Sequence, residues 1–370
     1  MNKLHAIHET LLMGPGPSCV PPQVYDALGT TTIGHLDPAF IEIMDDIKEM
    51  LRQLFQTDYE LTIPMSGTGS SGMETCFVNL VESGDKVLVL INGVFGMRMQ
   101  DVATRLGARV DTIEAEWGTA VDVDAVKTRL DTGAYDMVAV VHAETSTGVC
   151  NPVAEIGKRV RATGALYLVD AVTSLGGIPV DAKAWGVDAV YSGTQKCLSC
   201  PPGLAPVSFS PKAMEKLGKR KSKVPNWYLD LTMIANYWQG ATRAYHHTAP
   251  VNMLYALYAA LNCILDEGLP KVFERHQKAH QRLKEGLAEL GIEFLVKEAD
   301  RLPMLNAVTI PDGADDAAIR ARLLKKHHIE IGAGLGPLAG KIWRIGCMGH
   351  TARPENIDRL LSALGRELGR

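Results

Sequence analysis

The sequence has neither an excess of charge of one sign nor a long apolar run. It contains 38 Lys and Arg residues against 42 Asp and Glu residues, which gives a formal net charge of −4. A charge this balanced argues against nucleic-acid binding or electrostatic attachment to a membrane as the main role. No segment approaches the roughly 20 consecutive apolar residues that a membrane-spanning helix needs. We therefore expect neither a nucleic-acid partner nor a membrane partner.

The sequence also shows no sign of a targeting segment. The first residues have no apolar core of signal-peptide length, and the last three are not a peroxisomal signal of the Ser-Lys-Leu type. On these grounds we expect a cytoplasmic protein.

The cysteines do not form a disulfide framework. They are an odd number, seven, and they are scattered along the chain. Only Cys197 and Cys200 have the Cys-x-x-Cys spacing of metal or redox sites. One such pair supplies too few ligands for a closed zinc site, and redox function requires it to open a helix. We predict no metal site.

Between residues 61 and 209, short apolar segments alternate with amphipathic helical patterns. Segments such as 86–91 and 165–169 consist largely of Val, Leu and Ile without polar alternation, as expected for strands buried on both faces. This pattern predicts an α/β fold, in which helices cover both faces of a mainly parallel sheet.

The character of the chain changes after Pro225, where an aromatic and polar segment precedes two long helical patterns. Further short strands are expected near residues 292–296, 305–310 and 342–345. We predict an N-terminal arm (1–20), a large domain (21–250) and a smaller C-terminal α+β domain (251–370).

The two residues that dominate the functional interpretation each follow an apolar strand. Lys196 comes shortly after the strand predicted at residues 187–191, and Asp170 ends the one predicted at 165–169. Ligands of open α/β sheets bind at the carboxyl ends of the strands. Burial lowers the pKa of a lysine and makes it a nucleophile toward carbonyls, and a carboxylate can pair with a protonated pyridine nitrogen. Although either residue alone is more often a surface lysine or a helix cap, the pair predicts pyridoxal 5'-phosphate, bound to Lys196 as a Schiff base.

Other loops at strand ends fit such a cofactor. A strand, the loop Met-Ser-Gly-Thr-Gly-Ser-Ser-Gly at 65–72 and a helix form the arrangement that directs backbone N-H groups at an anion, although glycine-rich turns are common. Phe95 offers an aromatic plate for a ring, or is a core residue. Residues 142–148 offer hydroxyl groups, or form a capping turn.

Two further features suggest a substrate pocket. Arg344 lies on a predicted strand between apolar neighbours, which is costly unless the guanidinium meets a carboxylate. That carboxylate belongs either to one of the 42 acidic residues or to a substrate held by a bidentate clamp. The arm Gly-Pro-Gly-Pro-Ser at 14–18 is stiff, and it forms either a fixed wall of the site or a packed entry segment.

Two motifs closely resemble those of the class V, fold-type I pyridoxal-phosphate aminotransferases, in the alanine-glyoxylate and serine-glyoxylate (serine-pyruvate) branch. These are Asp-Ala-Val-Thr-Ser-Leu-Gly-Gly at 170–177 and Ser-Gly-Thr-Gln-Lys at 192–196. The resemblance extends nearly end to end, through motifs in the family's order at 14–18, 66–69, 144–149, 245–248, 334–337 and 344–346. It implies a large domain with a mainly parallel seven-stranded sheet, a smaller C-terminal domain and a homodimer with shared active sites.

The resemblance also implies roles for individual residues around the cofactor ring. Lys196 would carry the cofactor and shuttle the substrate proton, and Asp170 would pair with the ring nitrogen. Val172 would pack on one ring face and Phe95 on the other, where mammalian members have tryptophan. Thr145 would lie near the ring hydroxyl.

The remaining implied roles concern the phosphate and the substrate. The phosphate would be bound by Gly69, Ser70 and Gln195, together with Tyr245 and Thr248 of the second subunit. Mammalian members have histidine at the position of Ser70, so the role of that side chain is open. Arg344 would bind the substrate carboxylate, and Gly16 would line the substrate pocket.

The implied reaction is a ping-pong transamination that moves an amino group from alanine or serine to glyoxylate, giving glycine and pyruvate or hydroxypyruvate. Two other activities of the same fold remain open: 2-aminoethylphosphonate transamination, and a desulfurase or other lyase reaction. A nucleotide-binding oxidoreductase would share the α/β pattern but would explain neither Lys196 nor Asp170. The sequence does not fix the amino donor, because alanine and serine differ by one hydroxyl group.

Overall fold

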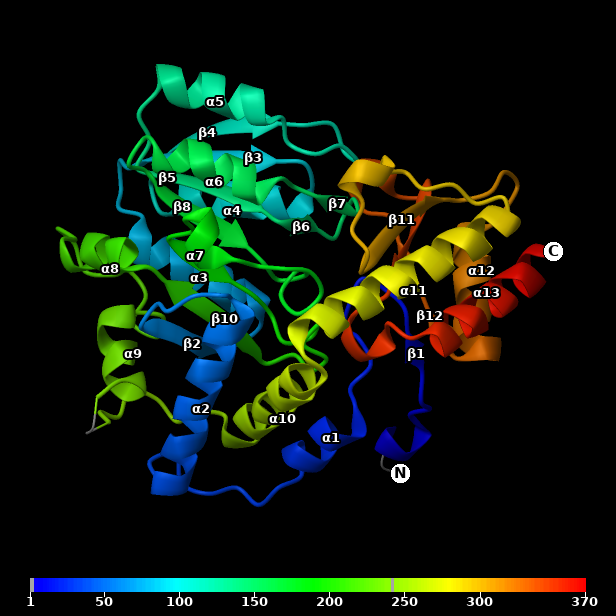
Figure 1. The fold of residues 1–370 in the computed structure, drawn as a ribbon, viewed down its shortest axis with the longest axis horizontal. Coiled ribbons are helices and arrows are strands. Elements are labelled where there is room, and N and C mark those ends of the chain that lie inside the picture. The colour runs from blue at the N-terminus through cyan, green and yellow to red at the C-terminus, as the bar shows by residue number, and fades with distance from the viewer. Residues whose placement is uncertain (1–2, 241–242) are drawn as a thin grey trace.

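The computed structural model describes residues 3–240 and 243–370. Residues 1–2, part of the predicted N-terminal arm, and residues 241–242 lie outside this description. Figure 1 shows a larger unit built on a sheet and a smaller unit beside it. The long helix α10 (Val251–Glu267) packs on the larger unit, and α11 (Leu269–Glu289) continues from it across the smaller unit.

The larger unit is organised around a seven-stranded sheet with the strand order β2-β10-β9-β8-β5-β3-β4. Only β10 runs antiparallel to its neighbours, so the predicted mainly parallel sheet is confirmed. The strands are β2 (Leu61–Ser66), β3 (Lys86–Ile91), β4 (Arg109–Glu114), β5 (Met137–Val141), β8 (Leu166–Asp170), β9 (Ala189–Tyr191) and β10 (Leu204–Phe209).

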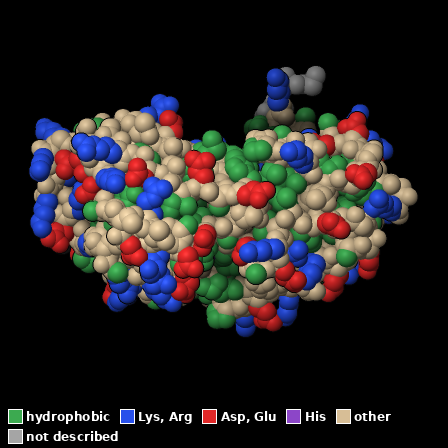
Figure 2. All heavy atoms as spheres, turned by 90° about the horizontal axis from the view of Figure 1, so that it is seen from above, with side chains coloured by type: hydrophobic (Ala, Val, Ile, Leu, Met, Phe, Trp, Pro, Cys, Tyr) green, Lys and Arg blue, Asp and Glu red, His purple; other side chains and the backbone are tan. Residues whose placement is uncertain are grey.

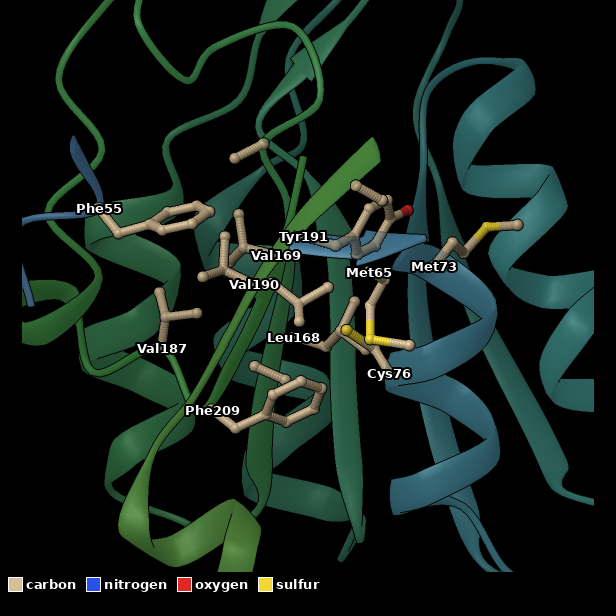
Figure 3. Close-up of a cluster of buried hydrophobic side chains, with 14 of the residues drawn as sticks. Phe55, Met65, Met73, Cys76, Leu168, Val169, Val187, Val190, Tyr191 and Phe209 are labelled. Atoms are coloured by element: carbon tan, nitrogen blue, oxygen red, sulfur yellow. The ribbon is translucent and has the colours of Figure 1, made fainter. Parts of the chain in front are cut away.

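Helices cover both faces of this sheet, because its central strands are apolar on both sides. Tyr191 faces helix α3 (Gly69–Leu80), where a side chain on Gly72 would approach the Tyr191 Cβ to 3.1 Å. Tyr167, three residues before Asp170, points to the opposite face and contacts α6 (Val153–Arg161) at Gly157. Figure 3 shows the two layers of buried side chains on either side of the strands.

The other helices of the larger unit connect or flank the strands. They are α1 (Pro22–Leu28), α2 (Pro38–Leu54), α4 (Val94–Arg105), α5 (Val123–Thr132), α7 (Ala182–Trp185), α8 (Pro211–Gly218) and α9 (Leu231–Trp238). Helix α2 begins at Pro38 after an Asp37 side chain that accepts a hydrogen bond from the Ala39 N-H. Two short strands, β6 (Ala143–Glu144) and β7 (Val149–Cys150), form a separate hairpin.

The smaller unit contains the antiparallel sheet β11-β14-β13, formed by Leu305–Thr309, Ile342–Gly346 and Gly332–Ala333. Helices α12 (Asp316–His327) and α13 (Pro354–Leu368) pack with it around a second hydrophobic cluster. The N-terminal arm joins this unit, because β1 (Leu11–Leu12) pairs in parallel with β12 (Ile329–Glu330).

One strand prediction in the smaller unit is wrong. Residues 292–296 form only an isolated bridge, between Phe294 and Val308. The segment bonds to β11 through the Leu295 N-H and the Glu293 carbonyl, which is too few contacts for a continuous ladder.

Helix α10 follows the predicted domain boundary, yet its buried side chains Leu254, Leu257 and Leu261 belong to the same hydrophobic cluster as the large sheet. The domain limits 1–20, 21–250 and 251–370 stay a prediction.

The face of the molecule in Figure 2 has basic and acidic side chains interspersed. Within residues 3–240 and 243–370, no helix is long and apolar enough to cross a membrane. The same residues contain no group of three or more His, Cys, Asp and Glu side chains that could hold a metal ion.

The close packing of α6 can be tested by adding a methyl group. In Gly157→Ala, the new Cβ would overlap the Trp185 carbonyl oxygen, so we expect the free energy of unfolding to fall by about 1–3 kcal/mol in chemical denaturation. Gly218→Ala is the matched control, because Gly218 lies in helix α8 with open space around it. The free energy of unfolding of the control should rise by up to about 1 kcal/mol. Equal stability of the two variants would contradict the described packing.

Candidate active site

A cavity of about 210 Å³ lies at the carboxyl ends of β8 and β9. The sequence-predicted residues Gly69, Ser70, Phe95, Asp170, Val172, Gln195 and Lys196 all line it. Asp170 and Tyr191 are register partners on the neighbouring parallel strands β8 and β9, and Lys196 follows β9 by a short loop. This pairing brings together two groups that are 26 residues apart in the sequence.

Asp170 is buried without a cationic hydrogen-bond partner among the described residues. Its Oδ1 accepts a hydrogen bond from the Val172 N-H at 2.8 Å, and its Oδ2 accepts one from the Tyr191 hydroxyl at 2.7 Å. Burial raises the pKa of the Asp170 carboxyl to about 7, although these hydrogen bonds favour the ionised form. A positively charged ring nitrogen would supply the counter-charge that this carboxylate lacks.

Lys196 is 8% exposed. Burial, assisted by the positive charge of Arg344, lowers the pKa of its ammonium group to about 8. The Lys196 Nζ donates a hydrogen bond to the Pro15 carbonyl oxygen. A side chain on Gly16 would approach Nζ to 2.6 Å, and Gly16 has φ +106°, so only glycine fits the arm against this lysine. Gly16 therefore lies next to the predicted catalytic amine.

The start of helix α3 lines the cavity at a position suited to an anion. Gly69 and Ser70 are its first two residues, and no side chain caps the helix at Thr68. Uncapped N-H groups and the positive end of the helix dipole favour an anion at this position. The Gln195 Oε1 is buried with no hydrogen-bond partner in the described structure. Because amide oxygen and nitrogen are interchangeable by rotation, this side chain can instead present an N-H to an anion.

The aromatic residue Phe95 is held in place by the buried carboxylate of Glu144. One Glu144 oxygen accepts a hydrogen bond from the Phe95 N-H at 3.2 Å, and the other accepts from the Ser146 hydroxyl at 2.5 Å. The Ser146 Oγ accepts in turn from the Val94 N-H at 3.0 Å. Glu144 thus fixes the first turn of α4, which carries Phe95. Burial raises the pKa of the Glu144 carboxyl.

Arg344 is 7% exposed and forms no ion pair within the described parts of the chain. Its Nε donates to the Ala333 carbonyl at 2.7 Å, and its Nη1 donates to the Thr145 carbonyl at 3.2 Å. Desolvation lowers the pKa of the guanidinium, and the negative charge of Glu144 opposes this effect. The internal salt bridge considered from the sequence is therefore absent from the described residues, which leaves a buried cation able to receive a carboxylate.

Five predicted residues do not line this cavity of their own chain: Gly16, Thr145, Tyr245, Thr248 and Arg344. Gly16 and Arg344 have been described above. Thr145 is buried beside the cavity, and its backbone carbonyl contacts Arg344. Tyr245 is 62% exposed, and its hydroxyl lies 3.5 Å from the Thr248 Oγ1. The family resemblance implies that Tyr245 and Thr248 belong to the site of a second subunit, which stays a prediction.

Four residues in the cavity wall were not among the predicted site residues: Thr68, Met73, Arg98 and Tyr191. Tyr191 had a signal in the sequence, since it ends the strand before the lysine motif. Arg98 lies one helical turn after Phe95 and could have been found from that spacing.

Comparison with known proteins decides the family. The model of the aminotransferase class V family matches residues 12–360. The chain belongs to the class V aminotransferases. The predicted resemblance and the predicted fold-type I architecture are both confirmed.

Similar proteins cover nearly the whole length of this class V aminotransferase. It is 40% identical to alanine–glyoxylate aminotransferase of Rattus norvegicus, covering 100% of this chain and 90% of the relative. It is 38% identical to (S)-ureidoglycine–glyoxylate transaminase of Bacillus subtilis, covering 95% of this chain and 89% of the relative. The crystal structure of alanine–glyoxylate aminotransferase from Nostoc sp. superposes with a TM-score of 0.96 at 47% identity. The match covers 100% of this chain and 99% of the Nostoc chain.

This class V aminotransferase is therefore a transaminase, which exchanges an amino group between amino acids and keto acids. Members of the family use pyridoxal phosphate. Asp170, Lys196 and the start of α3 offer a carboxylate, an amine and an anion site in one cavity, so the residues present fit this cofactor.

The missing counter-charge at Asp170 predicts a pH-dependent cost to stability. The carboxyl of the cofactor-free protein has a pKa of about 7, above its ordinary value of 3.8. The folded state therefore holds the proton more tightly, and stability falls as the pH rises from about 4 through 7. At pH 8, the free energy of unfolding of Asp170→Asn should exceed that of the wild type by on the order of 1–4 kcal/mol. This difference should shrink toward pH 4.

The measurement is chemical denaturation of the two cofactor-free proteins at several pH values. Lys196 also titrates near this range, but it is present in both proteins. A difference in stability that does not change between pH 8 and pH 4 would show that Asp170 is not a buried, uncompensated carboxyl.

Proposed function

We propose that this enzyme transfers an amino group from alanine or serine to glyoxylate, with pyridoxal 5'-phosphate bound at Lys196. The observation that carries the proposal is the shared cavity of Lys196 and Asp170, with the start of α3 at one end. Glyoxylate is the acceptor in the names of both the rat and the Bacillus subtilis relatives. The products would be glycine and pyruvate or hydroxypyruvate.

The roles of the residues follow from their charges and positions. When bound, pyridoxal phosphate supplies the aldehyde that condenses with amines and the ring that accepts electrons from the substrate. Asp170 would hold a proton on the ring nitrogen. Val172 and Phe95 would enclose the ring, and Thr145 would lie near its hydroxyl. Gly69, Ser70 and Gln195 would bind the phosphate.

Lys196 would move the substrate proton. With a pKa of about 8, a substantial fraction of its amine is neutral near pH 7–8, as a base requires. Arg344 would orient the substrate by its carboxylate, and Gly16 would leave room for the lysine while the arm closes the pocket. The reaction would proceed in two half-reactions, in which the amino donor and glyoxylate bind to the same site in turn.

We further propose a homodimer with shared active sites. Tyr245 is largely exposed, as are the nearby aromatic side chains Trp227 and Tyr228. Exposed aromatic side chains are frequent at protein interfaces. Tyr245 and Thr248 would contact the cofactor phosphate of the second subunit. The cytoplasmic location expected from the sequence remains a prediction.

Of the alternative activities, a desulfurase reaction is disfavoured by the state of the thiols. Cys197 and Cys347 are buried near the site, and burial raises the pKa of each thiol to about 12. A persulfide-forming cysteine needs an accessible thiolate. 2-Aminoethylphosphonate remains the alternative donor considered from the sequence.

A panel of substrates tests the proposed reaction. The purified enzyme with pyridoxal phosphate should form pyruvate from alanine or hydroxypyruvate from serine when glyoxylate is present, together with equal amounts of glycine. (S)-Ureidoglycine and 2-aminoethylphosphonate complete the panel of donors, and Lys196→Ala is the inactive control. If none of the donors yields glycine, glyoxylate is not the acceptor.

Arg344→Ala tests the proposed carboxylate anchor. We expect kcat/KM for α-amino acids to fall by about 10²-fold or more, because a charge-assisted bidentate contact is lost. Cofactor binding, measured by absorbance, should be retained. Arg344→Lys keeps the positive charge but not the two parallel N-H donors of the guanidinium, so it should recover only part of the activity. Unchanged turnover in Arg344→Ala would show that another group binds the carboxylate.

A further inference from the structure

The proposed phosphate site lacks a side-chain cation. A phosphate monoester carries a charge of about −1.5 to −2 near pH 7. The residues assigned to it, Gly69, Ser70, Gln195, Tyr245 and Thr248, are all uncharged. The start of α3 contributes the equivalent of only about half a positive charge. Lys196 is committed to the aldehyde end of the cofactor, so at least one negative charge remains uncompensated.

Arg98 is the other cation in the cavity wall. It lies in the first turns of α4 and lines the cavity together with Ser70 and Met73 of α3. Its guanidinium carbon lies 4.8 Å from the centroid of the Phe95 ring. This cation–π contact holds the long side chain beside the aromatic residue expected to cover the cofactor. Arg98 is solvent-exposed, yet it contributes to the cavity wall and its guanidinium stacks on Phe95.

The charge of Arg98 has no partner in the described structure. Across residues 3–240 and 243–370, no carboxylate forms an ion pair with it and no hydrogen bond involves its guanidinium. Arg105, the other arginine of α4, instead pairs with Asp101 one turn earlier, at 2.9 Å. A cavity-lining arginine that stacks on an aromatic ring and lacks a carboxylate is well suited to bind a phosphate.

We propose that Arg98 is a cofactor-binding residue that supplies the missing positive charge to the phosphate of pyridoxal phosphate. This inference rests on the proposed cofactor. Arg98 and Ser70 line the same cavity, so the proposed contact requires the guanidinium to turn toward the start of α3. Part of the phosphate affinity would thus come from α4, in addition to the start of α3.

The test compares ligands that differ only in the phosphate. Cofactor-free wild type, Arg98→Gln and Arg98→Lys are titrated with pyridoxal phosphate and with pyridoxal, followed by absorbance and protein fluorescence. Competition by inorganic phosphate is measured in the same assay. Arg98→Gln should bind pyridoxal phosphate 10- to 100-fold more weakly and inorganic phosphate correspondingly more weakly, while pyridoxal affinity changes less than threefold. Arg98→Lys should restore part of the loss, since it restores the charge.

A matched control and salt dependence sharpen the result. Arg105→Gln removes an arginine of the same helix that lies outside the cavity and should bind both ligands like the wild type. The affinity of the wild type for pyridoxal phosphate should fall more steeply with ionic strength than that of Arg98→Gln.

Two outcomes would overturn the proposal. Equal weakening of pyridoxal and pyridoxal phosphate would mean that Arg98 acts only through the position of Phe95. Unchanged affinity for both ligands would mean that its charge does not reach the cofactor. If the wild type itself binds no pyridoxal phosphate, the proposed cofactor is wrong. If the wild type binds it and Arg98→Gln binds it equally well, only the role of Arg98 is wrong.

Discussion

The parallel pairing of β8 with β9 is the constraint on which the active site depends. It sets Asp170 opposite Tyr191 in register, so that the Tyr191 hydroxyl reaches the Asp170 carboxylate and the chain leaving β9 carries Lys196 to the same cavity. A shift of one residue would turn Asp170 to the opposite face of the sheet, toward the helix layer that contains α6. Burial on both faces of the sheet favours this register, because every residue of β8 is buried.

The low polarity of this part of the fold shifts the pKa values of Asp170 and Lys196. Desolvation is the largest influence on both Asp170 and Lys196, and it moves their pKa values toward each other, to about 7 and about 8. Both groups are therefore poised near neutral pH. The same burial is costly to the empty protein, which holds a carboxyl without a cation at Asp170 and a cation without a carboxylate at Arg344. Cofactor and substrate of the proposed reaction would supply the two missing charges.

The surrounding segments act mainly by placing other groups. Glu144 ties the start of α4 to the hairpin β6–β7, and the next residue, Thr145, accepts a hydrogen bond from Arg344. The N-terminal arm pairs with β12 of the smaller unit and then crosses to Lys196, where Pro15 accepts a hydrogen bond from the amine. Both the proposed ring site and the proposed carboxylate site thus depend on contacts between the larger and smaller units.

The sequence by itself determined the α/β class and most of the strands, and it pointed to the two candidate residues Asp170 and Lys196, because unbroken apolar strands and polar residues at their ends are local patterns. The strand predicted at 292–296 failed because an apolar segment does not reveal whether a neighbour offers a full hydrogen-bonding ladder. Only the tertiary structure decided the strand order, the absence of a carboxylate partner for Arg344 in the described residues and the presence of Arg98 in the cavity. These features depend on which distant segments pack together, and burial and charge pairing are properties of that packing rather than of any single stretch of sequence.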